Sequence, residues 1–112
     1  MSDLPTAEEL IDGLKWYVDR AHALGLSVYI GTLLPIEGWR TYAPFREELK
    51  NQVNEWIRLT DGFEGCIDFD LAVQDPDHPA AFKAGYDSGD HLHPSGTGYK
   101  AMADAVPKSF LY

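Results

Sequence analysis

The sequence predicts an α/β fold in which helices cover the faces of a small parallel sheet. Segments with helical period alternate along the 112 residues with short apolar segments that contain β-branched residues. The apolar segments are almost continuous, which is typical of strands covered on both faces. The resulting order is helix, strand, helix, strand, helix, and this order produces a parallel sheet.

The first helix is expected to begin after Thr6 and to end before Gly25. Thr6 and Glu9 have the spacing of a capping box, which satisfies free backbone N–H groups at a helix start. Glycine is common directly after a helix. The apolar residues that recur at helical spacing are Leu10, Leu14, Tyr17, Val18, Ala21 and Leu24.

The run from Leu26 to Leu34 follows, and we expect a buried parallel strand that Pro35 ends. After an aromatic loop from Ile36 to Pro44, a second amphipathic helix is expected to run to about Leu59. Asp61 and Gly62 break it. The apolar stripe of this helix consists of Phe45, Leu49, Val53, Trp56 and Ile57.

A second short strand is expected from Gly65 to Phe69, and a long loop rich in Asp, Pro and Gly then leads to His93. Loops of that length in compact domains are usually functional. Ser95 can cap a last helix that ends at Pro107. The apolar stripe expected on that helix is Tyr99, Met102, Ala103 and Val106.

Two parallel strands leave both sheet edges unpaired, although parallel sheets are normally broad and covered. The sequence therefore predicts a partial flavodoxin-like fold, that is, half of a three-layer arrangement of helices, sheet and helices. A second copy of the chain, or a missing N-terminal half, could complete it. We expect residues 1–112 to form a single truncated domain that is completed by homo-oligomerisation.

The charge balance excludes several kinds of partner. The sequence contains nine Lys and Arg and 18 Asp and Glu. The resulting net charge of −9 repels phosphate backbones and anionic lipid headgroups. Nucleic acid and membranes are therefore not expected as partners. The N-terminus lacks the basic start and apolar run of a signal peptide. With a single cysteine, Cys66, which we expect to be a small buried apolar residue, the sequence favours a cytoplasmic location.

Asp90 and His93 are the candidate catalytic residues. An aspartate three residues before a histidine can reach its Nδ1 and hold the tautomer whose Nε2 accepts a proton. Pro94 restricts the backbone of His93 and helps to fix the ring. Taken by itself, this spacing is also compatible with an ordinary solvated polar loop.

Other polar and aromatic residues allow two readings each. His22 is expected at the surface, and His78 lies beside Asp75 and Asp77 without the spacing of a zinc site, so no metal and no cofactor are expected. Asp68 and Asp70 follow a strand end, where ligands bind but where caps and turns also occur. The aromatic residues of the loop either line a substrate pocket or cover the core or a subunit contact; the pocket candidates are Trp39 and Tyr42.

The chain as a whole resembles the second half of SGNH (GDSL-type) hydrolases. The likeness rests on the segments AHALGLSVYIGTLLP, VNEWIR, GCIDFD, DPDHP and GDHLHPSGTGYKAMADAV, and it covers about Leu4 to Phe110. Its most specific part is DHLHP, which is similar to the family's final D-x-x-H-P block. The resemblance implies that His93 is the catalytic base, that Asp90 orients it, and that His91 has no catalytic role.

The sequence departs from this family at the nucleophile. The resemblance implies a serine in a G-D-S block, with a Gly and an Asn from two later blocks in the oxyanion hole, and none of the three blocks is present. Among the five serines, Ser88 and Ser95 flank the Asp/His block and are the candidate nucleophiles, although Ser95 is also the expected helix cap. Either a serine from another subunit attacks the substrate, or His93 activates water directly.

We therefore expect hydrolysis of small carboxylic esters, with a small-molecule ester as the partner of the site. The alternative is a truncated remnant that folds and associates without catalysis. A carbohydrate- or peptide-binding module has only the aromatic loop in its favour.

Overall fold

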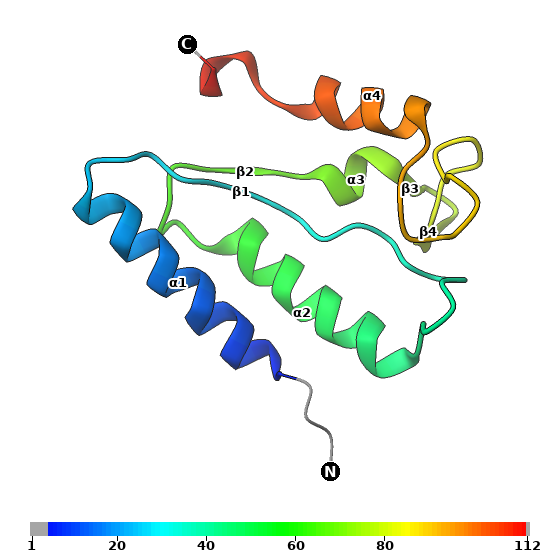
Figure 1. Ribbon diagram of the computed structural model, residues 1–112, viewed down its shortest axis with the longest axis horizontal. Helices are drawn as coiled ribbons and strands as arrows, with labels where there is room; N and C mark the ends of the chain where they lie inside the picture. Colours follow the sequence, from blue (N-terminus) through cyan, green and yellow to red (C-terminus); the bar gives the residue numbers. More distant parts are fainter. Residues whose placement is uncertain (1–4, 112) are drawn as a thin grey trace.

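The computed structural model describes residues 5–111. Within this range the predicted order of helix, strand, helix, strand and helix is present, with additional short elements between the second strand and the last helix. Figure 1 shows them in chain order. The elements are α1 (Ala7–Ala23), β1 (Tyr29–Gly31), α2 (Pro44–Leu59), β2 (Gly65–Ile67), α3 (Phe69–Val73), β3 (Gln74–Asp75), β4 (His78–Phe82) and α4 (Gly96–Ala105). A 3-10 turn, Lys108–Phe110, follows α4.

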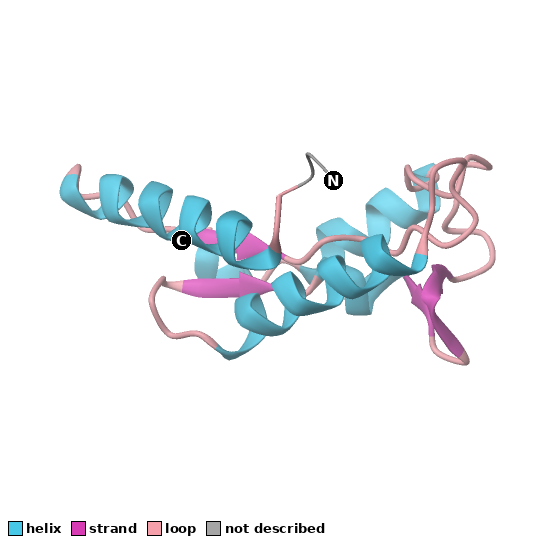
Figure 2. Cartoon of the chain, turned by 90° about the horizontal axis from the view of Figure 1, so that it is seen from below, coloured by secondary structure: helices cyan, strands magenta, loops and turns pink. Residues whose placement is uncertain are grey.

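The expected α/β fold with a parallel sheet and helices on its faces is confirmed. β1 and β2 pair in parallel, with Tyr29 opposite Gly65 and Gly31 opposite Ile67. The helices α1 and α2 lie on one face of this sheet and α4 on the other (Figure 1). Seen from below, the two strands separate across the short axis of the molecule (Figure 2). The molecule is flat, with extents of 43 × 40 × 19 Å. The two paired strands lie side by side along its shortest dimension (Figure 2).

Helix α1 has the predicted ends but a narrower buried face. Thr6 Oγ1 accepts a hydrogen bond of 3.1 Å from Glu9 N, and Gly25 adopts a φ of 79° just after the helix. Val18 is buried, whereas the predicted stripe residues Tyr17 and Leu24 are 69% and 75% exposed. The prediction was wrong for these two because α1 packs mainly against α2, which covers only part of the stripe.

The first strand is shorter and less covered than predicted. The prediction of a buried strand from Leu26 to Leu34 was wrong at both ends, since only Tyr29–Gly31 pair and both Leu26 and Leu33 are exposed. Thr32 N still donates to Ile67 O, but the pairing with β2 ends there, and Leu33 has no strand partner within residues 5–111. Instead, the buried Asn54 on α2 accepts from Leu33 N (2.7 Å) and donates to Leu33 O (2.9 Å), replacing a strand partner.

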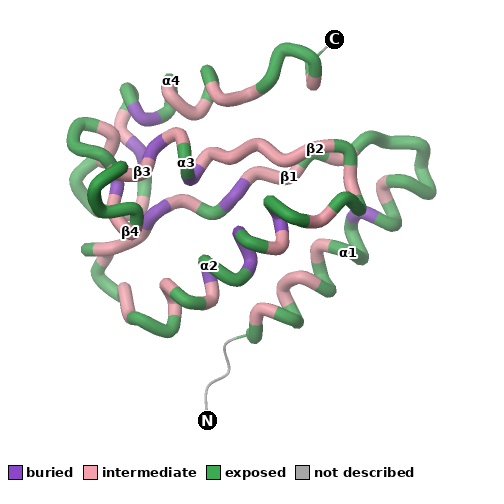
Figure 3. Tube along the Cα trace, turned by 180° about the vertical axis from the view of Figure 1, so that it is seen from behind, coloured by how far each residue is buried: buried purple, intermediate pink, exposed green. Residues whose placement is uncertain are grey.

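The buried residues gather where the two parallel strands end, between α2 and α3 (Figure 3). The buried apolar residues are Val53 and Ile57 from α2, Val73 and Phe82 from the segment after β2, and Val18 from α1. The segment predicted as a long loop after Phe69 instead holds α3 and the antiparallel β3–β4 hairpin. The loop prediction failed because these elements are very short and depend on local capping by Asp68, whose side chain accepts from Leu71 N.

Helix α4 begins as predicted but turns a different face inward. Ser95 Oγ accepts from Gly98 N (3.1 Å), the expected cap. Gly98 is buried against the backbone of Tyr86, while Tyr99, predicted in the apolar stripe, is exposed. The contact of Gly98 with the Tyr86 backbone determines which face of α4 is buried. The spacing of large apolar residues in the sequence gives no sign of this contact. Within residues 5–111, no helix is both long enough and apolar enough to cross a bilayer.

Candidate functional site

The segment 87–94 forms a compact turn that two aspartates hold together. Asp87 Oδ1 accepts from the backbone N–H groups of Gly89 (2.8 Å) and His91 (3.0 Å). Asp90 Oδ1 accepts from Leu92 (2.9 Å) and His93 (2.8 Å). Short aspartate side chains commonly bond their own backbone a few residues on, so the sequence itself favours this turn.

Asp90 and His93 are brought together by this turn. His93 Nδ1 lies 2.7 Å from Asp90 Oδ2, while the side chains are 65% and 48% exposed, respectively. The hydrogen bond from the His93 ring, followed by those from the two backbone N–H groups, holds the pKa of the Asp90 carboxyl well below its usual range. Within residues 5–111, the contact of Nδ1 with Asp90 is the hydrogen bond found for the His93 ring, and none is found for Nε2.

Each of the other three histidines is also paired with a carboxylate. His91 Nδ1 lies 2.5 Å from Asp87 Oδ2, His22 contacts Glu64, and His78 contacts Glu37. A carboxylate partner therefore does not by itself distinguish His93 from the other histidines. His91 has a φ of 61°, and its ring packs on Gly38, where a Cβ atom would lie 3.0 Å from the ring. Gly38 also has a φ of 94°, which favours glycine.

Comparison with known families adds an independent observation. The model of the GDSL-like lipase/acylhydrolase family matches residues 2–101, most of the chain. The chain belongs to this family. Membership indicates a hydrolase-type function at the level of the family, and it agrees with the resemblance carried by the DHLHP segment. None of the curated proteins compared with the chain matches it.

The two serines considered as nucleophiles for this GDSL-family chain are both held in other hydrogen bonds. Ser88 Oγ donates to Asp90 Oδ1 over 3.0 Å. Ser95 Oγ caps α4 and donates to Gly85 O over 2.6 Å. In the described part of the chain, no serine hydroxyl is bonded to His93 Nε2, and Ser2 lies outside the described residues. Within one chain, the geometry therefore favours structural roles for Ser88 and Ser95.

An apolar cavity of about 350 Å³ lies beside the turn that carries the Asp90–His93 pair. Trp39 and Leu92 are among its lining residues, and Leu92 is the direct neighbour of His93. Tyr42, the other predicted pocket residue, does not line this cavity. Burial and the nearby Glu47 carboxylate raise the pKa of Tyr42. Of the two aromatic candidates, Trp39 is the one that the structure places on a cavity near His93.

Sequence reasoning missed a charged network at the end of β2. Arg58 on α2 bonds Asp68 through two nitrogens at 2.8 Å each and bonds Asp70 at 2.8 Å. The hydrogen bonds from Arg58 help to hold the pKa of Asp68 below its usual range, whereas burial raises the pKa of Asp70. The strand-end position of the two aspartates was the available signal, but nothing in the sequence paired them with Arg58.

Among residues 5–111, no group of three or more His, Cys, Asp or Glu side chains is arranged to hold a metal ion. Cys66 is half-buried, and burial raises the pKa of its thiol, which favours the unreactive protonated form.

Proposed function

We propose that the chain hydrolyses small carboxylic esters, with His93 as the general base and Asp90 as the group that orients it. The observation that carries the proposal is the 2.7 Å contact between Asp90 Oδ2 and His93 Nδ1 on a turn fixed by backbone hydrogen bonds. Membership in the GDSL-like lipase/acylhydrolase family supports acyl-group chemistry at this pair.

Two routes lead from this pair to products. In the first, His93 Nε2 takes a proton from a water molecule whose oxygen attacks the ester carbonyl carbon. The bond to the alcohol oxygen then breaks, and His93 returns the proton to the leaving alcohol. In the second, a serine hydroxyl of another copy is the attacking group, and an acyl-enzyme forms before water releases the acid.

The apolar cavity beside Leu92 is the proposed site for the apolar part of the substrate. Its volume of about 350 Å³ is near the lower end of the ~300–1,000 Å³ typical of small-molecule sites. Trp39 supplies its aromatic wall, and Tyr42 would contact only groups outside it. This arrangement supports small substrates rather than long acyl chains.

The proposal includes a homo-oligomer formed by a single truncated domain, in a reducing, cytoplasmic setting. The chain exposes 7359 Å², about 1,200 Å² more than the roughly 6,200 Å² expected for a monomer of its mass. That excess is greater than the ~800 Å² that each partner buries in a standard interface. Large exposed apolar side chains contribute to it, among them Trp16, Tyr17, Leu24, Leu26, Leu59 and Leu71.

Turnover of p-nitrophenyl acetate by the full chain tests the proposal, with His91→Ala as a matched control for His93→Ala. Both histidines are exposed and paired with an aspartate in the same turn, so ordinary surface imidazole chemistry is lost equally from either variant. General-base catalysis contributes roughly 10²–10⁴-fold. We expect kcat/KM to fall by at least about 100-fold in His93→Ala and to change little in His91→Ala.

A serine-directed phosphonate then separates the two routes. Covalent labelling with loss of activity supports a serine from another subunit, and activity that survives the reagent supports direct water activation. Equal rates for the parent chain and His93→Ala would leave the other candidate, a remnant that folds and associates without catalysis. The large exposure of both side chains to solvent, unlike the dry setting of efficient active sites, is the observation that favours this alternative.

A further inference from the structure

We propose that a second, charged cavity binds a neutral molecule rich in hydroxyl groups, such as a sugar or another polyol. The cavity lies between α2, α3 and the start of β4 and has a volume of about 610 Å³, well within the ~300–1,000 Å³ of small-molecule sites. Its walls are mostly charged and amide side chains. We call it the polar cavity and define it by Glu47, Lys50, Arg58, Asp68, Asp70 and Gln74.

The polar cavity contains two charged groups that are almost completely buried. Lys50 and Asp70 are each only 5% exposed, although Lys and Asp are rarely buried unless they are paired. Lys50 Nζ lies 3.1 Å from Glu47 Oε2, and Asp70 Oδ2 lies 2.8 Å from Arg58 Nη2. Each buried charge thus has one ion-pair partner on α2, Glu47 or Arg58, and both charged groups line the cavity.

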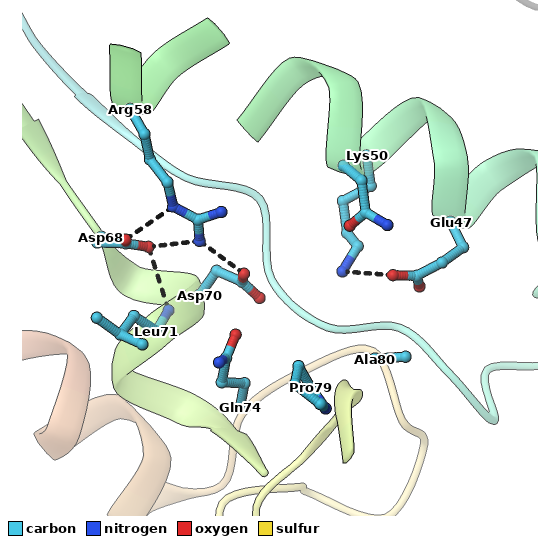
Figure 4. A pocket seen from close by; sticks show the side chains of 10 residues that line it. Glu47, Lys50, Arg58, Asp68, Asp70, Leu71, Gln74, Pro79 and Ala80 are labelled. Carbon is cyan, nitrogen blue, oxygen red and sulfur yellow. Dashed lines mark hydrogen bonds and ion pairs between the residues drawn. The ribbon is translucent and has the colours of Figure 1, made fainter. Parts of the chain in front are cut away.

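Hydrogen-bonding capacity remains unused on both sides of this space. Asp70 Oδ1 and Glu47 Oε1 are buried oxygens without a hydrogen-bond partner within residues 5–111. Lys50 Nζ has three donors, and Glu47 is its one ion-pair partner in the same range. Figure 4 shows the second oxygen of Asp70 turned toward the space between Gln74 and Lys50. Unpartnered buried polar atoms are costly, so their presence beside a cavity points to a ligand that completes them.

The position of the cavity also fits a ligand site. Asp68 and Asp70 directly follow β2, at the carboxyl end of the parallel strands, which is where open α/β sheets bind ligands. No residue of the 87–94 turn lines the polar cavity. The inference therefore does not rest on the proposed hydrolysis at Asp90 and His93, although Lys50 lines both the polar cavity and the apolar one.

The unused groups define the chemical class of the ligand. The two carboxylate oxygens accept hydrogen bonds, whereas the spare N–H groups of Lys50 donate them. A hydroxyl group does both, so several hydroxyls on one molecule match the cavity. A protonated amine offers no acceptor to Lys50, and an anion offers no donor to the oxygens of Asp70 and Glu47. The cavity is lined by the carboxylates of Glu47, Asp68 and Asp70 as well as by Lys50 and Arg58, so hydrogen bonding and not charge favours a neutral ligand.

Titration of the full chain followed by NMR tests this inference. The probes are D-glucose and D-xylose, with ethylammonium and acetate as charged controls. We expect saturable chemical-shift changes with at least one sugar at the side-chain amides of Gln74 and Asn51. Glu47→Gln and Asp70→Asn should each weaken binding by about tenfold, as expected for losing one hydrogen bond to a charged group.

Glu48→Gln is the matched control, because Glu48 lies on the same helix, is exposed and does not line the cavity. It should leave the affinity unchanged. If Asp70→Asn loses its helical circular dichroism, Glu47→Gln alone decides the test. The proposal is overturned by the absence of saturation with both sugars, by saturation with a charged control only, or by equal affinities of Glu47→Gln and Glu48→Gln.

Discussion

The Asp90 side chain has two hydrogen-bonding roles, and replacing it with alanine removes both. Its Oδ1 anchors the backbone at Leu92 and His93, and its Oδ2 contacts the imidazole of His93. Replacement by alanine would therefore release the turn as well as the ring, so loss of activity in that variant would not isolate the orienting role. Asparagine retains an oxygen that can accept the backbone N–H groups but carries no charge to stabilise the protonated imidazole.

The depressed pKa of Asp90 gives a pH prediction for the turn. The carboxylate is stabilised in the folded state, so its contribution to stability is fully present above the ordinary aspartate pKa of about 3.9 and is lost as pH falls through the lower folded pKa. We expect the Asp90 carboxyl carbon in NMR to titrate below pH ~3.9. A midpoint at or above that value would contradict the hydrogen-bond geometry of the turn, and His93→Ala should move the midpoint upward.

A contact between two residues could be predicted from the sequence only when the two residues are close together along the chain. Asp90 and His93 are three residues apart, so spacing alone was enough to propose that they meet. The contact of Arg58 with Asp68 and Asp70, and that of His78 with Glu37, need the packing of separate elements and left no pattern in the sequence. Whether the Asp90–His93 pair is catalytic stays a prediction.

Among the elements, the long helices were predictable and the short ones were not. α1 and α2 each supply several turns of periodic apolar residues, and their ends follow local rules of capping. α3 has five residues and β3 two, too few for a period to be recognised. The predicted length of the first strand was wrong for a different reason. The length of a strand depends on its neighbours, and β2 is the only strand that pairs with β1 within residues 5–111.

Two glycine-to-alanine substitutions test the packing of the helices in opposite directions. An alanine Cβ at Gly98 would lie 2.5 Å from Tyr86 O and 3.0 Å from Pro94 Cβ, so Gly98→Ala should lower the free energy of unfolding by about 1–3 kcal/mol. Gly13 lies within α1 with open space around it, and Gly13→Ala should raise that free energy by about 0.5–1 kcal/mol. Urea denaturation measures both, and equal effects would contradict the described packing of α4.

On the scale of the whole molecule, the sheet edges are the most unusual feature. Thr32 N donates to Ile67 O and Val28 O accepts from Glu64 N, so residues with even numbers in this stretch face β2. Tyr29 and Gly31 consequently direct their backbone groups to the opposite, unpaired edge, since alternate residues of a parallel strand face alternate neighbours. An unpaired edge of this kind is a template for another strand.

Light scattering after size-exclusion chromatography checks the proposed association. We expect a mass of at least twice the 12.5 kDa of the chain at micromolar concentration. Tyr29→Pro removes an N–H from the unpaired edge without removing one from the pairing with β2, and it should shift the mass toward the monomer. A mass of 12.5 kDa for the parent chain across this range would refute the homo-oligomer.

The uneven placement of the core has a consequence for local opening. Val18 is the one buried residue of α1 within the described chain, whereas α2 contributes Lys50, Val53, Asn54 and Ile57. Amide protons of α1 should therefore exchange with solvent through small, frequent detachments of that helix. Those of α2 should exchange chiefly when the entire chain unfolds, so the two helices would behave as separate cooperative units.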